Sequence, residues 1–147
     1  ACKTICSLLK RRNQNEWIDL ELNGYLHKFG TEGEMEKALP DYRKTTLLYL
    51  DEFNRPIMVG DRVSFIQDYP MGQSIAEIEA NVDKGFFIVG GPRINLLREQ
   101  FKVPVVQAQI AHLNLLRVLN AVNNKMLDFL NQVNLRARVC WYSFRNL

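Results

Sequence analysis

Apolar positions recur at alternating intervals of four and three residues toward the C-terminal end of the chain, from Val105 to Val133. This spacing is typical of a helix that buries one side. Further apolar residues flank the repeat, so the apolar face spans about half of the helix circumference, which is wider than the seam of a two-stranded coiled coil. The pattern therefore predicts one long helix over 105–133 that is buried against the rest of the chain or against another copy of it. The repeat consists of Leu116, Asn123 and Leu130 at one heptad position and of His112, Leu119, Met126 and Val133 at another.

Two interpretations of this helix are open. In the first, it is a core helix that packs on the sheet of a single α+β domain. In the second, it is an oligomerisation helix, because a buried asparagine such as Asn123 at a seam position can fix the register between two chains. The residues expected to form that interface are Leu116, Leu119, Asn123, Met126 and Leu130.

Residues 17–29 show the alternation of a β-hairpin. Apolar and polar residues alternate from Trp17 to Leu22, and the alternation resumes after Asn23-Gly24. The Asn-Gly pair supplies the positive φ that a type I′ turn needs at both central positions. In the resulting register Asp19 faces Lys28, which is a favourable cross-strand pair. The pattern predicts two antiparallel strands joined by this turn.

Shorter patterns complete a predicted α+β fold that forms a single domain over residues 1–147. Ser74 and Glu77 form a capping box, which predicts a short helix that ends before Gly85. In this prediction an antiparallel sheet packs against the 105–133 helix, which two shorter helices flank. The sheet strands are expected at 17–29, 45–66 (with a bend at Gly60-Asp61) and 86–89, a last strand at 137–144, helices at 2–13 and after Pro92, and a solvated acidic connection at 30–41.

Composition is that of an ordinary soluble globular protein. The chain has 147 residues, of which 47% are hydrophobic and 24% charged, and this length suffices for one proper core. It contains no run of about 18 apolar residues, so no membrane span is expected. The N-terminal residues lack the apolar stretch of a secretory signal. Three widely separated cysteines favour reduced thiols and an intracellular, cytoplasmic location.

Charge is distributed unevenly, although the net charge is only +3. Basic residues gather toward both ends of the sequence and acidic residues lie between them. If the two ends lie close together, they form one basic patch in which an aromatic side chain can stack on a base. This arrangement makes binding of nucleic acid or another polyanion an alternative function. The residues expected to form the patch are Lys10, Arg11, Arg12, Arg136, Arg138, Trp141 and Arg145.

A glycine turn between a strand and a helix offers a second alternative. Gly90-Gly91 follows the apolar strand 86–89 and precedes a helix that begins near Pro92. Amides at the start of a helix bind anions, and Arg93 would assist them. Against this, the spacing of the known phosphate loops is absent, and Pro92 lacks one of the amides such a nest requires. Gly90, Gly91 and Arg93 are thus a candidate anion turn in a phosphate-ligand binding protein.

No catalytic or metal-binding motif is present. His27 and His112 have no Ser, Cys or Asp at a spacing that would complete a catalytic relay. Cys2 and Cys6 share one helix face, but zinc needs two further ligands at close spacing. The prediction is therefore no catalytic residue, no metal and no cofactor. The favoured function is a small non-enzymatic protein that binds other proteins or itself.

Overall fold

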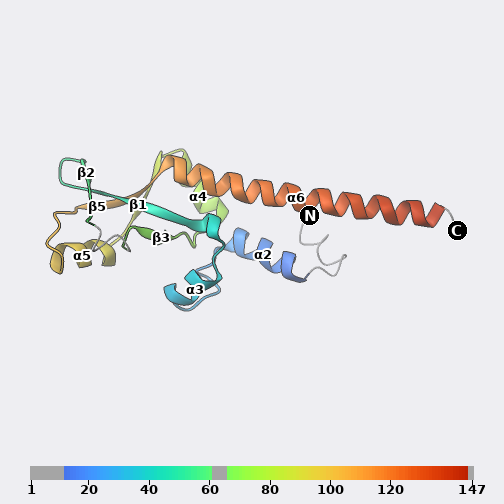
Figure 1. Cartoon of the computed structure of the whole chain (residues 1–147), viewed down its shortest axis with the longest axis horizontal. Coiled ribbons are helices and arrows are strands. Elements are labelled where there is room, and N and C mark those ends of the chain that lie inside the picture. The colour runs from blue at the N-terminus through green and yellow to red at the C-terminus, as the bar shows by residue number, and fades with distance from the viewer. Residues whose placement is uncertain (1–11, 61–65, 146–147) are drawn as a thin grey trace.

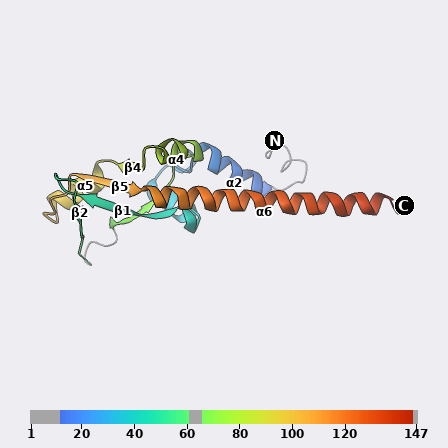
Figure 2. The ribbon, with the colours of Figure 1, turned by 90° about the horizontal axis from the view of Figure 1, so that it is seen from above.

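The computed structural model describes residues 12–60 and 66–145, with side chains for 14–60 and 66–134. Strands and short helices form a body at one end, and one long helix runs along this body and projects beyond it (Figures 1 and 2). The predicted α+β class with an antiparallel sheet and a long C-terminal helix is confirmed. The elements are α2 (Arg12–Asn23), α3 (Glu32–Ala38), η1 (Asp41–Arg43), β1 (Lys44–Leu50), β2 (Pro56–Ile57), β3 (Asp68–Pro70), α4 (Ile75–Val82), β4 (Phe86–Val89), α5 (Pro92–Glu99), β5 (Gln107–Ala111) and α6 (His112–Arg145).

The sheet is covered on one face. Its strands follow the order β2-β1-β5-β4, and β3 pairs with the first residues of β1. Side chains on the inner face of β1 and β5 are buried against α4, α5 and the start of α6, and this packing forms the main core. Their neighbours Thr46, Leu48, Gln107 and Gln109 lie on the other face and are partly or fully exposed. This alternation is the mark of an antiparallel sheet with one solvated face.

The patterns with local signals are confirmed. Strands form at 44–50 and 86–89. The capping box is present, because Ser74 caps the Glu77 amide and the Glu77 carboxylate caps the Ser74 amide. The chain leaves this helix through Gly85, whose φ is +83°. Of the strand predicted at 45–66, residues 44–50 and 56–57 are strands, and 61–65 lie outside the described residues, as does most of the helix predicted at 2–13.

The hairpin predicted at 17–29 is wrong, because residues 12–23 form helix α2. Ile18, Glu21 and Tyr25 are buried, and this three- and four-residue spacing is that of a helix. Gly24, with φ +85°, ends the helix and donates its N–H to the Leu20 carbonyl. Its positive φ thus serves a helix end rather than a type I′ turn.

The long helix begins later and ends later than predicted. Residues 107–111 form strand β5, in which Ala108 and Ile110 are buried between β1 and β4. The helix then starts at His112 and continues to Arg145, so the strand predicted at 137–144 is wrong. The sequence from 112 to 145 contains neither Gly nor Pro, and nothing local stops the helix.

The acidic connection predicted at 30–41 contains a helix. Thr31 caps α3 by accepting a hydrogen bond from the Glu34 amide. Met35 is buried together with Tyr25 and Leu39 in a small second core. A single buried methionine at the centre of the segment therefore outweighs its three exposed glutamates.

A buried charged cluster joins α2, η1, the segment after β3, and α6. We call it the Glu21–Arg43 cluster. The Arg43 guanidinium pairs with the Glu21 carboxylate and donates to the carbonyls of Met71 (3.2 Å) and Gln73 (2.6 Å). Both charged side chains are buried. The cluster thus ties α2 to the segment that leads into α4.

Aromatic residues complete the cluster around the same carboxylate. Tyr25 and Tyr42 donate their hydroxyl hydrogens to Glu21 Oε1 at 2.8 Å and 2.6 Å. Trp17 Nε1 donates to the Tyr42 hydroxyl at 2.8 Å. The Lys125 ammonium of α6 lies 5.0 Å from the Trp17 ring centroid and 5.4 Å from that of Tyr42. These cation–π contacts link the cluster to the long helix.

We expect Glu21→Gln to destabilise the protein by about 3–5 kcal/mol, because it leaves the buried Arg43 without a counter-charge. The double variant Glu21→Leu with Arg43→Met removes both charges, so it should lose less stability than Glu21→Gln alone. Urea unfolding followed by circular dichroism measures both. A Glu21→Gln variant as stable as the wild type would show that the pair does not hold the fold together.

Burial and the hydrogen bond to Glu21 raise the pKa of Tyr42 to about 12, from an ordinary value of 10.0. The folded state thus favours the neutral phenol, and this contribution to stability is complete below pH 10 and is lost as pH rises toward about 12. The pKa of Tyr25 is raised for the same reasons and adds to the loss. In a pH series of urea unfolding experiments, Tyr42→Phe should lose stability less steeply above pH 10 than the wild type. Parallel curves would contradict the assignment.

Candidate functional site

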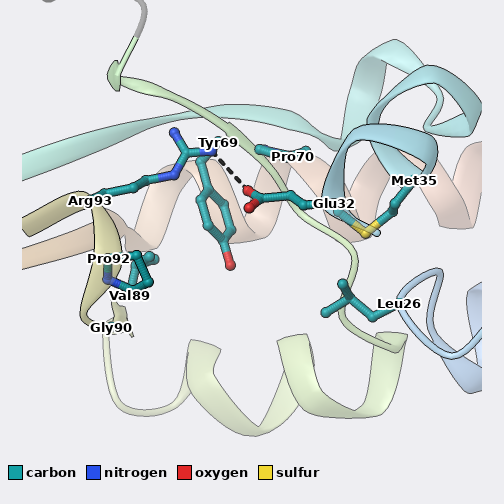
Figure 3. Close-up of a pocket in the computed structure, with 9 residues that line it drawn as sticks. All are labelled: Leu26, Glu32, Met35, Tyr69, Pro70, Val89, Gly90, Pro92 and Arg93. Atoms are coloured by element: carbon teal, nitrogen blue, oxygen red, sulfur yellow. Dashed lines mark hydrogen bonds and ion pairs between the residues drawn. The ribbon is translucent and has the colours of Figure 1, made fainter. Parts of the chain in front are cut away.

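A small cavity lies beside the candidate anion turn, between α3, β3 and the start of α5 (Figure 3). Its volume is about 250 Å³. Gly91, with φ +31°, precedes α5 and Pro92 is the first residue of that helix. Gly90 and Arg93 line the cavity, whereas Gly91 does not. The complete lining is Leu26, Glu32, Met35, Tyr69, Pro70, Val89, Gly90, Pro92 and Arg93.

Arg93 already has partners for its donors. One guanidinium nitrogen donates to the carbonyls of Ile66 (3.1 Å) and Asp68 (2.6 Å), and the other pairs with Glu32 at 2.9 Å. The guanidinium also lies 5.5 Å from the Tyr69 ring centroid. Its charge is therefore neutralised within the chain, and an anion at the turn would have to compete with Glu32. The arrangement fixes α5 to α3 and β3.

Sequence reasoning missed Glu32 as part of this site, since it predicted a solvated glutamate in a loop. The two members of the pair are 61 residues apart, and no local pattern links them. Leu26 and Met35 were missed for the same reason, because their positions depend on the turn into α3. The only available signal was the proximity of Arg93 to the glycine turn.

The long helix α6 buries one side against the body. Leu115, Val118, Val122 and Phe129 are buried on this side. Phe129 packs with Ile18 of α2, joined by Met126 and Val133. The five predicted interface residues are divided between two sides of the helix. Leu119 and Met126 pack partly on the body, whereas Leu116, Asn123 and Leu130 lie away from it.

A second set of positions on α6 faces away from the body, and we call it the outward stripe. Leu113 is 76% exposed, Leu127 57% and Leu130 37%. Spacing alternates between three and four residues along the stripe, so its members share one side of the helix. The stripe carries no charge. Its members are Leu113, Leu116, Asn120, Asn123, Leu127 and Leu130.

The candidate polyanion residues fall mostly where side chains are not described. Lys10 and Arg11 lie outside the described residues, and Arg12 is the first residue of α2. Arg136, Arg138, Trp141 and Arg145 belong to the backbone of α6, rather than to the edge strand that was predicted. A helix displays successive residues on different sides, so these four do not alternate as they would on a strand.

Titratable groups form no recognisable centre in the described part of the chain. No group of three or more His, Cys, Asp or Glu is placed to hold a metal ion within residues that the structure describes. His27 is exposed, and a ring nitrogen of His112 lies 3.1 Å from the Val82 carbonyl. Among the described helices, none is long and apolar enough to cross a bilayer.

Comparison with known proteins gives one match. The model of the AbiTii family matches residues 1–138, which is most of the chain. No curated protein and no solved structure shows a significant match.

We expect Arg93→Met to lower stability by about 1–3 kcal/mol, because two carbonyls lose a charged donor. Inorganic phosphate should leave the Tm of the wild type unchanged, since Glu32 already occupies the guanidinium. Differential scanning fluorimetry across a phosphate series, with chloride at equal ionic strength as the control, measures this. A rise in Tm with phosphate that is lost in Arg93→Met would instead establish the anion turn.

Proposed function

The chain belongs to the AbiTii family, and we propose that it acts as a non-enzymatic binding protein that associates with a second copy of itself through the outward stripe of α6. The observation that carries this proposal is the row of leucines left exposed on a helix whose opposite side is already buried. The non-enzymatic part rests on the sequence, which has no catalytic motif. An intracellular site of action, expected from the three cysteines, belongs to the same proposal.

The stripe is complementary to itself. Along the helix it presents two leucines, two asparagines and two leucines. When two such helices run antiparallel about the centre of the stripe, leucine meets leucine and asparagine meets asparagine. A parallel pair gives the same matching, position by position. Each asparagine amide both donates and accepts hydrogen bonds, so facing asparagines satisfy one another.

No charge on the stripe opposes this pairing. Lys125 lies over the aromatic rings of the Glu21–Arg43 cluster, and Arg117 donates to the Lys44 carbonyl at 2.9 Å. Both cations thus have partners on the body. The helix surface that remains free is apolar or amide-bearing, which suits a contact that excludes water.

The body holds α6 in the orientation that this contact needs. Leu115 and Val118 anchor the first turns in the main core, and Phe129 anchors the middle of the helix on α2. Because these anchors lie on one side, the helix cannot rotate to bury the outward stripe within its own chain. A second copy offers the same stripe in the same rigid setting, which lowers the entropic cost of association.

We expect the wild type to form a dimer and Leu127→Lys to weaken the dimer at least about tenfold, since a charge then enters an apolar contact. Sedimentation velocity and multi-angle light scattering over a concentration series measure the dissociation constant. The dimer should persist at high salt because the stripe is uncharged.

Leu22→Lys is the matched control, because Leu22 is an equally exposed leucine on α2 rather than on the stripe. It should leave the dissociation constant unchanged. A wild type that stays monomeric up to about 100 μM, a concentration at which a contact of this class is populated, would refute the proposal. So would equal weakening by both variants.

A further inference from the structure

Strand β4 forms an open edge of the sheet. It pairs with β5 on one side, and the sheet order within the described residues places no strand on its other side. Its sequence, Phe86 to Val89, contains neither charge nor proline. Natural edges usually carry such features to prevent pairing with other chains. The opposite edge does so, since β2 is two residues long and begins with Pro56.

The direction of the backbone groups on β4 follows from bonds elsewhere in the sheet. Leu47 donates its N–H to Gln67, and Asp51 donates to Arg55, so the odd residues of β1 face the β2–β3 side. The even residues of β1 then face β5, and the Leu50 carbonyl accepts from the Val106 N–H on that side. Successive residues of a strand alternate in this respect.

The alternation continues across β5. Leu48 pairs with Gln109, so Gln109 faces β1, and its neighbours Ala108 and Ile110 face β4. Their partners Val89 and Phe87 therefore spend their backbone groups on β5. The N–H and C=O groups of Phe86 and Ile88 are left to point outward from the edge. No hydrogen bond from these groups is found among the described residues.

Two cavities flank the inner side of this edge. Phe87 lines one of about 490 Å³, and Val89 lines the cavity of about 250 Å³ that also contains Met35 and Pro92. Leu26 lines both, so the cavities are neighbours. Residues two apart on a strand point to the same face. A strand laid along β4 would thus direct two alternate side chains toward the two cavities.

The cavities differ in chemistry. The smaller is mostly lined by apolar side chains, which suits leucine or a similar residue. The larger contains the amides of Gln73 and Asn81 and the Glu77 carboxylate, which suits a lysine or arginine. On the outer face, the side chains of Phe86 (39% exposed) and Ile88 (55% exposed) offer apolar contact to the intervening residues.

We propose that β4 binds an extended peptide segment of a partner protein as an added strand. The segment carries an apolar residue opposite Val89 and a basic residue opposite Phe87. The backbone groups of Phe86 and Ile88 supply the hydrogen bonds, and the two cavities supply the sequence preference, as in other cases of strand addition. This site is separate from the outward stripe, and it stands or falls independently of self-association.

The probes are two fluorescent capped heptapeptides, acetyl-TVLVKVT-amide for antiparallel addition and acetyl-TVKVLVT-amide for parallel addition. We expect one of them to bind the full chain, as measured by fluorescence anisotropy. Methylating the backbone nitrogens of the two valines that pair with Phe86 and Ile88 should weaken binding at least about tenfold, since the side chains are unchanged but the donors are lost. Failure of both peptides to bind at about 1 mM would overturn the proposal.

Variants of the protein test the same geometry. Ile88→Pro removes an outward N–H without removing a bond to β5, and it should weaken binding at least about tenfold. Met58→Pro is the control at the opposite edge and should not change the affinity. Glu77→Gln keeps the capping box but should weaken the lysine peptide about threefold, with no effect on a peptide in which glutamine replaces the lysine.

Amide hydrogen exchange distinguishes edge pairing from a loss of folding. In the free protein the amides of Phe86 and Ile88 should exchange fast, whereas those of Phe87 and Val89 are protected by β5. Bound peptide should protect Phe86 and Ile88. If rising protein concentration alone protects them, the edge pairs with a second copy and the peptide proposal is wrong. Peptide binding that leaves both amides unprotected would also overturn it.

Discussion

The buried ion pair between Glu21 and Arg43 is the interaction on which the rest of the structure depends. It places a carboxylate from α2 against a guanidinium at the start of β1, and it satisfies the carbonyls of Met71 and Gln73 before α4. Four segments that are distant in sequence therefore meet at one point. A buried pair adds little net stability compared with apolar residues, but removing one partner is costly, so it favours one arrangement of these segments over others.

That arrangement determines what α6 can do. Lys125 and Phe129 bind the helix to α2 and to the aromatic residues of the cluster, while Leu115 and Val118 bind it to the sheet. The helix is thus held by one side only, and its leucines at 113, 127 and 130 stay in water. The open edge at β4 arises from the same economy of covering elements, because α4, α5 and α6 protect one face of the sheet and leave its margin free.

The sequence predicted those elements whose signals are local. Strand 86–89 and the helix after Ser74 have their own composition and capping residues, and both are present. At 17–29 the period-two pattern also allowed a helical face of Ile18, Glu21 and Tyr25, and the partner that decides between them, Arg43, lies 22 residues away from Glu21. Similarly, the boundary at His112 depends on β5 pairing with two strands that no local pattern specifies. The pairing of Arg93 with Glu32 was out of reach for the same reason.

Cysteine cross-linking on the outward stripe tests the central claim most directly. In a chain whose three native cysteines are replaced by serine, single cysteines are placed at Asn120, Asn123 or Asn124, alone and in mixtures, and oxidised. Asn124 lies on the same exposed helix but off the stripe. The account predicts rapid dimer cross-links for Asn123 with itself in a parallel pair, or for Asn120 with Asn123 in an antiparallel pair, and slow ones for Asn124. Equal rates at all three positions, or no cross-link at any, would contradict it.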